Sequence, residues 1–309
     1  MRSQSAVEYL TTYGWVIIII AIVVLAFFYL GVFNANTYAP TLPPGSCQVY
    51  RPYGPGTSYS MRLTGLCNEN PEYLFASHGI NDYVVINSSS PRSLLNVQNS
   101  ITITAWVAVT GNPYHDVVDK EGQYGMKLDY ENSPHPCSPS GNPGWCLEWD
   151  TSADWNGVSY PIPAAGYNKF MFLAVSMDSS GNKYWYANGQ LIGTELHTGG
   201  ISYIASNVAI GTFSPDCTVC RSVGYGDAEW FNGAISNVQI YNTSLPQHTI
   251  SALYQEGIGG APIDLQNLVG WWPLDGNGND YSGNNQNSVS NGITFTGGPW
   301  WSTYQTPTT

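Results

Sequence analysis

Residues 183–195, KYWYANGQLIGTE, carry the sequence pattern that decides the fold. Two runs rich in aromatic and aliphatic residues flank the dipeptide Asn188-Gly189. Asn-Gly suits the two central positions of the tight turn that joins antiparallel strands, because both positions need a positive φ angle. The segment therefore predicts a β-hairpin.

Four further segments have the alternating pattern of strands: residues 100–110, 169–178, 207–213 and 235–242. In the first of them, one set of positions is aliphatic and the other is mostly threonine. The aliphatic set is Ile101, Ile103, Ala105, Val107 and Val109, and the other set is Thr102, Thr104, Trp106 and Thr110. This alternation predicts a strand that is half-buried, with one face on a core.

One short helix is expected after the last of these strands. Ser244 is the predicted N-cap, Gln247 follows three residues later, and the helix is expected to end at Gly257. Its apolar side would carry Ile250, Leu253 and Tyr254. Many short strands with a single helix predict a mainly β fold, a β-sandwich of jelly-roll type.

Six blocks between residues 80 and 254 resemble, in order, the motifs of laminin-G-like, concanavalin-A-like jelly rolls. They are INDYVVINSS, ITITAWV, DVVDKEGQYGMKL, NKYWYANGQLIG, VAIGTF and FNGAISNVQIYNTSLPQHTISALY. The resemblance implies this fold but says less about function, because the fold hosts lectins, adhesion modules and glycosidases alike.

One block stands in an unusual place. In this family a segment like LVGWWPLDGNGNDYSGNN precedes the NDYVVI strand, whereas here it occupies residues 268–285. It could begin a truncated second domain or complete a permuted sandwich. Only about 40 residues remain after Leu268, too few to bury a core unaided. We therefore expect residues 268–301 to pair back onto a single jelly-roll domain spanning residues 46–309.

The N-terminal part of the chain has a different character. Residues 14–33 are twenty consecutive residues without charge, and as a helix they would be about 30 Å long, the thickness of a hydrocarbon core. We expect a transmembrane or pilin-type helix over residues 4–33, with a cytoplasmic N-terminus and an extracellular ectodomain. Residues 34–45, which hold Pro40, Pro43 and Pro44, predict a stiff linker.

Glu8 stands six residues before this apolar run, where an ionisable group calls for a reason. A cut after Ser3 would make Gln4 the first residue and Glu8 the fifth. This start resembles the class III signal of archaeal type IV pilin-like proteins. The resemblance implies a leader at residues 1–3, and a Glu8 that pairs with the α-amino group of a like subunit in a filament. A plain signal anchor and a removed signal peptide cut after Ala35 are the alternatives.

The composition limits the kinds of partner that the protein can bind and indicates the compartment in which it resides. The 309 residues carry a net charge of −12 without any basic cluster, which argues against a nucleic-acid partner. Six cysteines form three local couples that suggest disulfides outside the cell, with sequential pairing favoured and other pairings open. They are Cys47 with Cys67, Cys137 with Cys146, and Cys217 with Cys220. Asn87 and Asn242 begin N-glycosylation sequons.

A calcium site is one interpretation of the segment WPLDGNGNDYSGN. Oxygen-bearing side chains alternate there in a glycine-broken loop, as calcium requires, and Asn81 and Asp82 could contribute. The four candidate ligands are Asp275, Asn277, Asn279 and Asp280. The alternative is a set of Asx turns that satisfy their own backbone.

Glycan binding and glycan hydrolysis are the two chemistries to weigh for the ectodomain. Exposed rings and polar groups bind sugars, and the candidate rings are Trp145, Trp149 and Trp155. Glu148 and Asp150 would share one face of a strand, as in jelly-roll glycosidases. The third acidic residue of that motif is missing, since Ser152 and Ala153 stand in its place. We therefore do not expect an enzyme.

The sequence as a whole predicts a surface protein with a structural and adhesive role. A pilin-like helix would contact the membrane or like subunits, and the jelly roll would bind an extracellular glycan or protein. The alternative is a membrane-anchored glycan-binding module that does not assemble, and a glycoside hydrolase is the third interpretation.

The N-terminal mass of the chain extracted from native envelopes distinguishes these readings of the first residues. We expect a mature chain that begins at Gln4, and a Glu8→Gln variant that is processed but fails to assemble, since it lacks the charge for pairing. A chain that still begins at Met1 would leave a simple anchor, and a start after Ala35 would contradict both.

Overall fold

The structure is a computed structural model. It describes residues 16–25, 46–50, 58–62, 71, 73–78, 82–110, 116–131, 144–151, 155–159, 169–196, 201–213, 230–296, 304, 305 and 307. The predictions for Ser3, Gln4, Glu8, Cys67, Cys137, Cys217 and Cys220 lie outside these residues. Cys47 and Cys146 lie on described strands, but their side chains are not described, so the disulfide pairing stays a prediction.

The chain divides into two units, Met1–Pro43 and Pro44–Thr309. In the first unit residues 16–25 form a helix, and its large apolar side chains are 41% to 67% exposed. Among the described residues, no helix has both the length and the apolar character needed to cross a bilayer.

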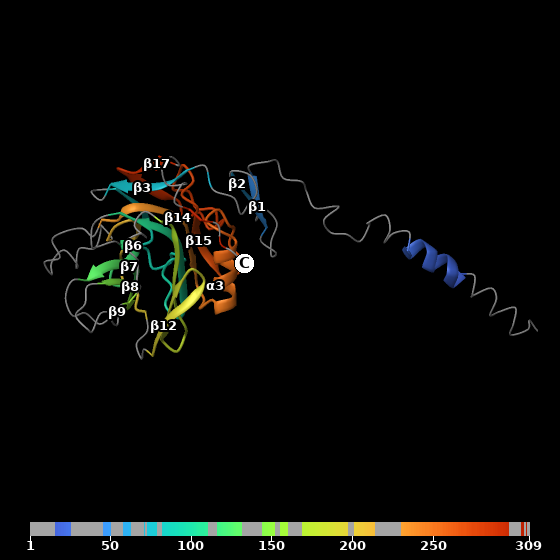
Figure 1. Ribbon diagram of the computed structural model, residues 1–309, viewed down its shortest axis with the longest axis horizontal. Helices are drawn as coiled ribbons and strands as arrows, with labels where there is room; N and C mark the ends of the chain where they lie inside the picture. Colours follow the sequence, from blue (N-terminus) through green and yellow to red (C-terminus); the bar gives the residue numbers. More distant parts are fainter. Residues whose placement is uncertain are drawn as a thin grey trace, which may run out of the picture. The chain divides into compact units, whose positions relative to one another are not determined.

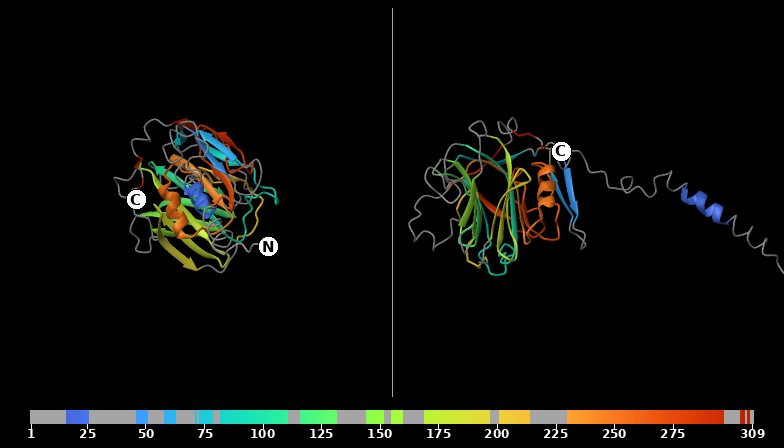
Figure 2. Two further views of the ribbon diagram at one scale, coloured as in Figure 1. Left: turned by 90° about the vertical axis from the view of Figure 1, so that its right-hand side faces the viewer. Right: turned by 60° about the horizontal axis from the view of Figure 1, so that its bottom comes forward.

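The second unit is a sandwich of two antiparallel sheets (Figures 1 and 2). The seven-stranded sheet has the order β16-β4-β13-β6-β7-β8-β9. Its strands are β4 (Tyr83–Ile86), β6 (Asp116–Lys120), β7 (Tyr124–Glu131), β8 (Gly144–Thr151), β9 (Trp155–Ser159), β13 (Val208–Ile210) and β16 (Ser288–Asn291).

The eight-stranded sheet has the order β12-β11-β10-β5-β14-β3-β17, and β15 also pairs with β14. Its strands are β3 (Leu74–His78), β5 (Ile101–Val109), β10 (Met171–Met177), β11 (Asn182–Ala187), β12 (Gln190–Leu196), β14 (Asn232–Tyr241), β15 (Leu268–Trp272) and β17 (Thr294–Thr296). A separate antiparallel pair is formed by β1 (Ser46–Tyr50) and β2 (Ser58–Arg62).

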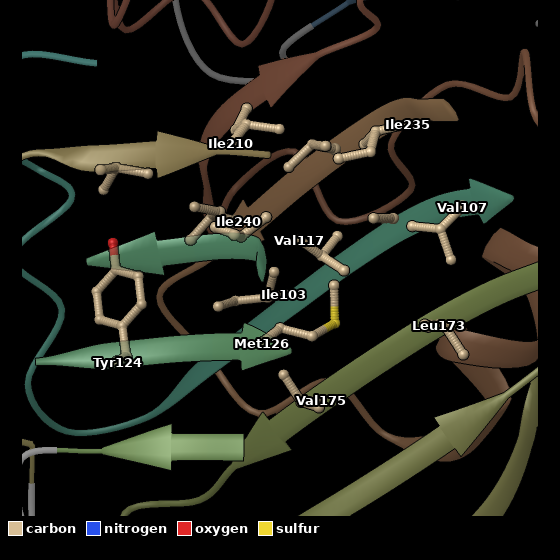
Figure 3. Close-up of a cluster of buried hydrophobic side chains, with 14 of the residues drawn as sticks. Ile103, Val107, Val117, Tyr124, Met126, Leu173, Val175, Ile210, Ile235 and Ile240 are labelled. Atoms are coloured by element: carbon tan, nitrogen blue, oxygen red, sulfur yellow. The ribbon is translucent and has the colours of Figure 1, made fainter. Parts of the chain in front are cut away.

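The main core lies between the two sheets (Figure 3). The eight-stranded sheet contributes side chains such as Ile103 and Val175, and the seven-stranded sheet contributes Met126 and Ile210. All four are less than 1% exposed, and removing such side chains from water is the main force that holds the sheets together.

The predicted hairpin is confirmed. β11 and β12 pair directly, and the residues between them, Asn188 and Gly189, have φ angles of 48° and 74°. These positive values are those of the tight turn that Asn-Gly favours.

The prediction that residues 100–110 form a half-buried strand is right about the strand and wrong about its exposure. Every residue of β5 is buried, on both faces. The aliphatic set faces the main core, but Trp106 on the other face packs against Phe172, Tyr254 and Tyr304 in a second apolar cluster. A helix and the C-terminal segment cover the face that the threonine-rich pattern assigned to water.

The covering helix is α3 (Gln247–Gln255), which lies against the outer side of the eight-stranded sheet (Figure 2). Its N-cap is Pro246 and not Ser244, because Ser244 Oγ hydrogen-bonds Ser176 Oγ at 2.8 Å instead. The helix ends where predicted, with Glu256 as C-cap and Gly257 following at a φ angle of 80°, a conformation that favours glycine.

The C-terminal segment supplies strands to both sheets. β15 pairs with β14, β16 pairs with β4, and β17 pairs with β3, all antiparallel. Residues 268–296 thus pair with the sandwich of this same chain.

β14 changes partner at Asn237. Its first half pairs with β3 and its second half with β15, and between them Asn237 takes a φ angle of 51°. Its Oδ1 accepts hydrogen bonds from Trp271 Nε1 at 2.8 Å and Gln239 Nε2 at 2.9 Å, and its Nδ2 donates to the Gly260 carbonyl at 2.8 Å. One side chain therefore fixes both the change of partner and the layer that covers the sheet.

Replacing Asn237 by alanine is expected to lower the free energy of unfolding by about 3 kcal/mol, because it leaves buried donors and an acceptor without partners and strains the positive φ. Asn237→Gly also loses the hydrogen bonds but is not strained by the positive φ. Its free energy of unfolding should therefore lie between those of the parent protein and of Asn237→Ala. The control is Asn242→Ala, at an exposed position just after the same strand. Equal denaturant midpoints for the Asn237→Ala and Asn242→Ala variants would contradict this account.

Candidate functional site

The outer face of the seven-stranded sheet carries a row of ionisable side chains. Lys127 lies opposite Asp116 of β6 and opposite Glu148 of β8. The neighbours of Lys127 and Glu148 along their strands belong to the main core. Because side chains alternate along a strand, Lys127 and Glu148 point away from that core, and the Asp116 carboxylate meets Lys127 there.

This row is largely shielded from solvent. The side chains of Asp116 and Lys127 are 0% and 12% exposed, and their ion pair has an Nζ–Oδ1 distance of 3.4 Å. Glu148 is 5% exposed. Lys127 Nζ also lies 5.8 Å from the ring centroid of Phe213, within range of a cation–π contact. The opposite charges offset part of the desolvation cost of burying them.

A third acidic side chain, that of Asp119, lies near this row. Asp119 is 2% exposed and pairs in register with Gly125 of β7. A Cβ atom at Gly125 would come within 2.8 Å of Asp119 Oδ1. Glycine at this position therefore leaves the room that the Asp119 carboxylate occupies.

Two aromatic rings stack at one end of the sandwich. Tyr83 and Trp230 have ring centroids 5.5 Å apart and an interplanar angle of 29°. Tyr83 begins β4, Trp230 stands two residues before β14, and both side chains are partly exposed. Ile210 of β13 pairs with Val84 on one side and Val118 on the other, so the stack and Asp116 lie at the same end of the sheet.

The three tryptophans predicted to bind sugar do not form this stack. Trp149 is 0% exposed and belongs to the main core, so it presents no ring face to a ligand. The side chains of Trp145 and Trp155, on β8 and β9, lie outside the described part of the chain. The Tyr83–Trp230 stack was missed because nothing in the sequence indicates that these two distant residues meet.

The segment considered for calcium is organised by Asp280. Its Oδ1 accepts the N–H groups of Trp271 and Ser282 at 3.0 and 2.8 Å. Its Oδ2 accepts the hydroxyl of Ser282 and the N–H of Gln286, both at 2.9 Å. A carboxylate has about four acceptor positions, so Asp280 has none left for a cation.

Two of the other predicted ligands also accept hydrogen bonds from backbone groups. Asp275 Oδ1 accepts the N–H of Tyr73 at 2.7 Å, and Asn277 Oδ1 accepts the N–H of Asn279 at 2.9 Å. Within the described ranges, no three His, Cys, Asp or Glu side chains are placed to hold a metal ion. Because the acceptor positions of Asp280 are used within the chain, Asp280 does not fit the predicted calcium site, and Asx turns describe Asn277 and Asp280.

The two sequon asparagines, Asn87 and Asn242, are both exposed. Each stands directly after the last residue of a strand, β4 and β14. Glycosylation at these positions stays a prediction that their exposure permits.

The buried amine of Lys120 is surrounded by backbone carbonyl groups. Its Nζ donates to the carbonyl groups of Ser88 and Ile204 at 3.3 and 3.5 Å, and to that of Ser206. Burial lowers the pKa of Lys120 to about 8, against a smaller opposing effect of the nearby Asp119 carboxylate. Lys120 holds the segment of residues 204–206 against the end of β4.

The sequence of residues 78–251 matches the family Laminin_G_3, described as the concanavalin A-like lectin/glucanases superfamily. The chain belongs to this superfamily. The jelly-roll fold expected from the six sequence blocks is thereby confirmed. No curated protein sequence matches the chain.

The chain is similar to several solved structures. A candidate carbohydrate-binding protein from Bacteroides ovatus ATCC 8483 superposes with a TM-score of 0.53 at 16% identity, over 77% of this chain and 66% of that protein. The chain thus spans just under two thirds of that protein's length. A heptameric SAP-like pentraxin from Limulus polyphemus gives 0.47 at 15% identity, over 72% and 93% of the two chains. The binding domain of botulinum neurotoxin DC, in complex with SialylT, gives 0.37 at 16% identity, over 69% and 45%.

The superfamily includes glucanases, which directs attention to Glu148 and Asp150. They occupy alternate positions of β8, as the sequence predicted. Glu148 is buried opposite Lys127, and the side chain of Asp150 is not described. Glu148 therefore presents no accessible carboxylate of the predicted pair, and that of Asp150 lies outside the described side chains.

Lys120 makes the stability of the fold depend on pH. Its pKa is about 8 in the folded protein against 10.5 in the unfolded chain, so between these values the unfolded chain binds more protons and the free energy of unfolding rises with pH. From pH 8 to pH 10 Lys120 alone contributes a gain of about 2 kcal/mol. Burial raises the pKa values of Tyr124, Tyr186 and Tyr241, and these groups oppose the gain near pH 10, so the effect of Lys120 is measured as a difference between proteins. In denaturant titrations over this range, the stability of the parent protein and of Lys169→Met, an exposed-site control, should change by about 2 kcal/mol more in the favourable direction than that of Lys120→Met. The same pH dependence in Lys120→Met as in the parent would contradict the role of Lys120.

Proposed function

We propose that the protein binds carbohydrate through the Tyr83–Trp230 stack. The observation that carries the proposal is a pair of partly exposed rings at one end of a lectin-like sandwich. Aromatic faces pack against the C–H faces of sugar rings, and nearby polar groups bind the hydroxyls. The superfamily includes lectins, and the Bacteroides ovatus relative of the same fold is a candidate carbohydrate-binding protein.

Polar side chains border the stack. Exposed Asn291 of β16 lies opposite Tyr83 in register. Asn232, two residues after Trp230, accepts a 2.5 Å hydrogen bond from Thr110 Oγ1, and both residues are partly exposed. Amide and hydroxyl groups of this kind supply the directional contacts that orient a sugar on a ring surface.

Attachment to a membrane or to like subunits is the second part of the proposal. The helix of residues 16–25 is apolar on every side and exposed on every side, and such a surface in water favours burial in lipid or against another apolar helix. The adjoining sequence extends the apolar run to residues 14–33, and Glu8 would set the register between subunits. The N-terminal mass measurement tests this part without reference to the sugar site.

Binding of the intact protein to immobilised neutral, amino-bearing and acidic oligosaccharides tests the first part. We expect Trp230→Ala to weaken binding at least about tenfold, since a ring–sugar stack contributes on the order of 1–2 kcal/mol. Trp230→Phe should retain part of the affinity, because it keeps an aromatic ring. Tyr83→Ala should weaken binding about as much as Trp230→Ala does.

Tyr73→Ala is the matched control, because Tyr73 is 40% exposed but packs beside Gly276 and not in the stack. Circular dichroism and thermal midpoints verify that each variant is folded. Unchanged affinity in folded Trp230→Ala, or an equal loss in Tyr73→Ala, would refute the assignment of the binding surface.

A further inference from the structure

We propose that Lys127 and Asp116 become joined by an amide bond between their side chains, with Glu148 as the group that transfers the protons. The proposal is independent of sugar binding, because it uses the ionisable row and not the aromatic stack. It rests on the register of three adjacent strands, on one interatomic distance and on the low solvent exposure of all three side chains.

The sheet holds the two reacting groups together. Asp116 and Lys127 are directly opposite in the ladder of β6 and β7, and Lys127 Nζ lies 3.4 Å from Asp116 Oδ1. This contact holds the amine beside the carboxyl group whose Cγ it would attack. Groups held next to each other react as if at a very high effective concentration, because the entropy of bringing them together is already lost in folding. The pairing of β6 and β7 therefore positions the amine and the carboxyl group for reaction.

Burial makes the reactive protonation states more accessible than they are in water. Charged amines and carboxylates do not form amides, whereas a neutral amine is a nucleophile and a neutral carboxylic acid is an electrophile. The side chains of Asp116 and Lys127 are 0% and 12% exposed. Their ion pair favours the charged forms, but the desolvation of both groups opposes it, so transfer of a proton from the ammonium to the carboxylate costs less here than between solvated groups.

Glu148 supplies a third ionisable group on the other side of the amine. It lies opposite Lys127 in the ladder of β7 and β8 and is 5% exposed. Directly opposed residues have Cβ atoms about 5 Å apart, which places a glutamate side chain within reach of a lysine amine. A carboxylate there can accept a proton from the nitrogen and return it to the leaving oxygen.

The reaction balances without a cofactor. Lys127 Nζ attacks Asp116 Cγ, a C–N bond forms, and one C–O bond of the carboxyl group breaks. Two protons leave the nitrogen and depart with that oxygen as water, so nothing is oxidised or reduced. The product replaces two buried charges by one neutral amide, which removes their desolvation cost.

Mass spectrometry of the reduced, intact chain tests the proposal. We expect the parent protein to be lighter by one water than its sequence, and a protease digest to yield a branched peptide that joins the segments around Asp116 and Lys127. Lys127→Arg keeps the positive charge but should not form the amide, and Glu148→Gln should leave most chains unlinked. Asp116→Asn should reach the same final mass as the linked parent, because it releases ammonia instead of water.

Another route to the loss of water must be separated from this one. An Asp-Gly pair such as Asp275-Gly276 can cyclise with loss of water, but that loss would persist in Lys127→Arg and would map to a different peptide. Thermal midpoints confirm that each variant is folded. Full mass in the folded parent protein, or a loss of water that Lys127→Arg retains, would overturn the proposal.

Discussion

The burial of β5 on both faces is the constraint on which the rest of the structure depends. One face can be covered by the seven-stranded sheet, as in any sandwich. The other face carries Trp106, and it needs a second layer that the strands alone do not provide. α3, the segment leading into β15 and Tyr304 together form that layer. The chain after β14 is thus required for the sheet itself.

The second layer is held by polar as well as apolar contacts. Asn237, Gln239, Tyr241 and Trp271 form a continuous hydrogen-bonded chain on the outer side of β14. These groups are buried, and Asn237 links the three side chains of β14 to Trp271 of β15 and to the Gly260 carbonyl in the loop after α3. A buried polar network that is fully satisfied specifies one arrangement, because any other placement of the cover would leave donors unpaired.

The sequence predicted those features that depend on neighbouring residues. The Asn188-Gly189 turn and the inner face of β5 follow from dihedral preference and from a period of two. The cover over Trp106 could not be predicted, because its residues come from later in the chain. Ser244 was a reasonable N-cap by residue type, but a nearby Ser176 competes for its hydroxyl. Asp280 illustrates the same limit, since calcium sites and Asx turns use the same residues and differ only in which donors the oxygens meet.

The residues of the candidate sites were harder to predict from the sequence than the strands and turns. Trp149 is a core residue although its neighbourhood in sequence suggested a binding surface, since a tryptophan pattern does not tell which side of a strand faces water. Tyr83 meets Trp230, and Asp116 meets Lys127 next to Glu148, only once strand order and register are known. Contacts across strands are set by the sheet and not by spacing along the chain. The N-terminal signal and the cysteine pairs remain predictions, because they fall outside the described residues or on side chains that are not described.

The pairing of β16 with β4 and of β17 with β3 has a consequence for how the chain folds. β3 and β4 are synthesised long before their partners β17 and β16, so part of the sheet pairing is between residues distant in sequence. Such topologies fold slowly, since long loops must close before their contacts form. Until residues 288–296 arrive, β3 and β4 each have an open edge, and an unpaired edge is where a chain binds other strands. A chain truncated before β16 should therefore be a substrate for chaperones and prone to aggregation rather than a smaller stable domain.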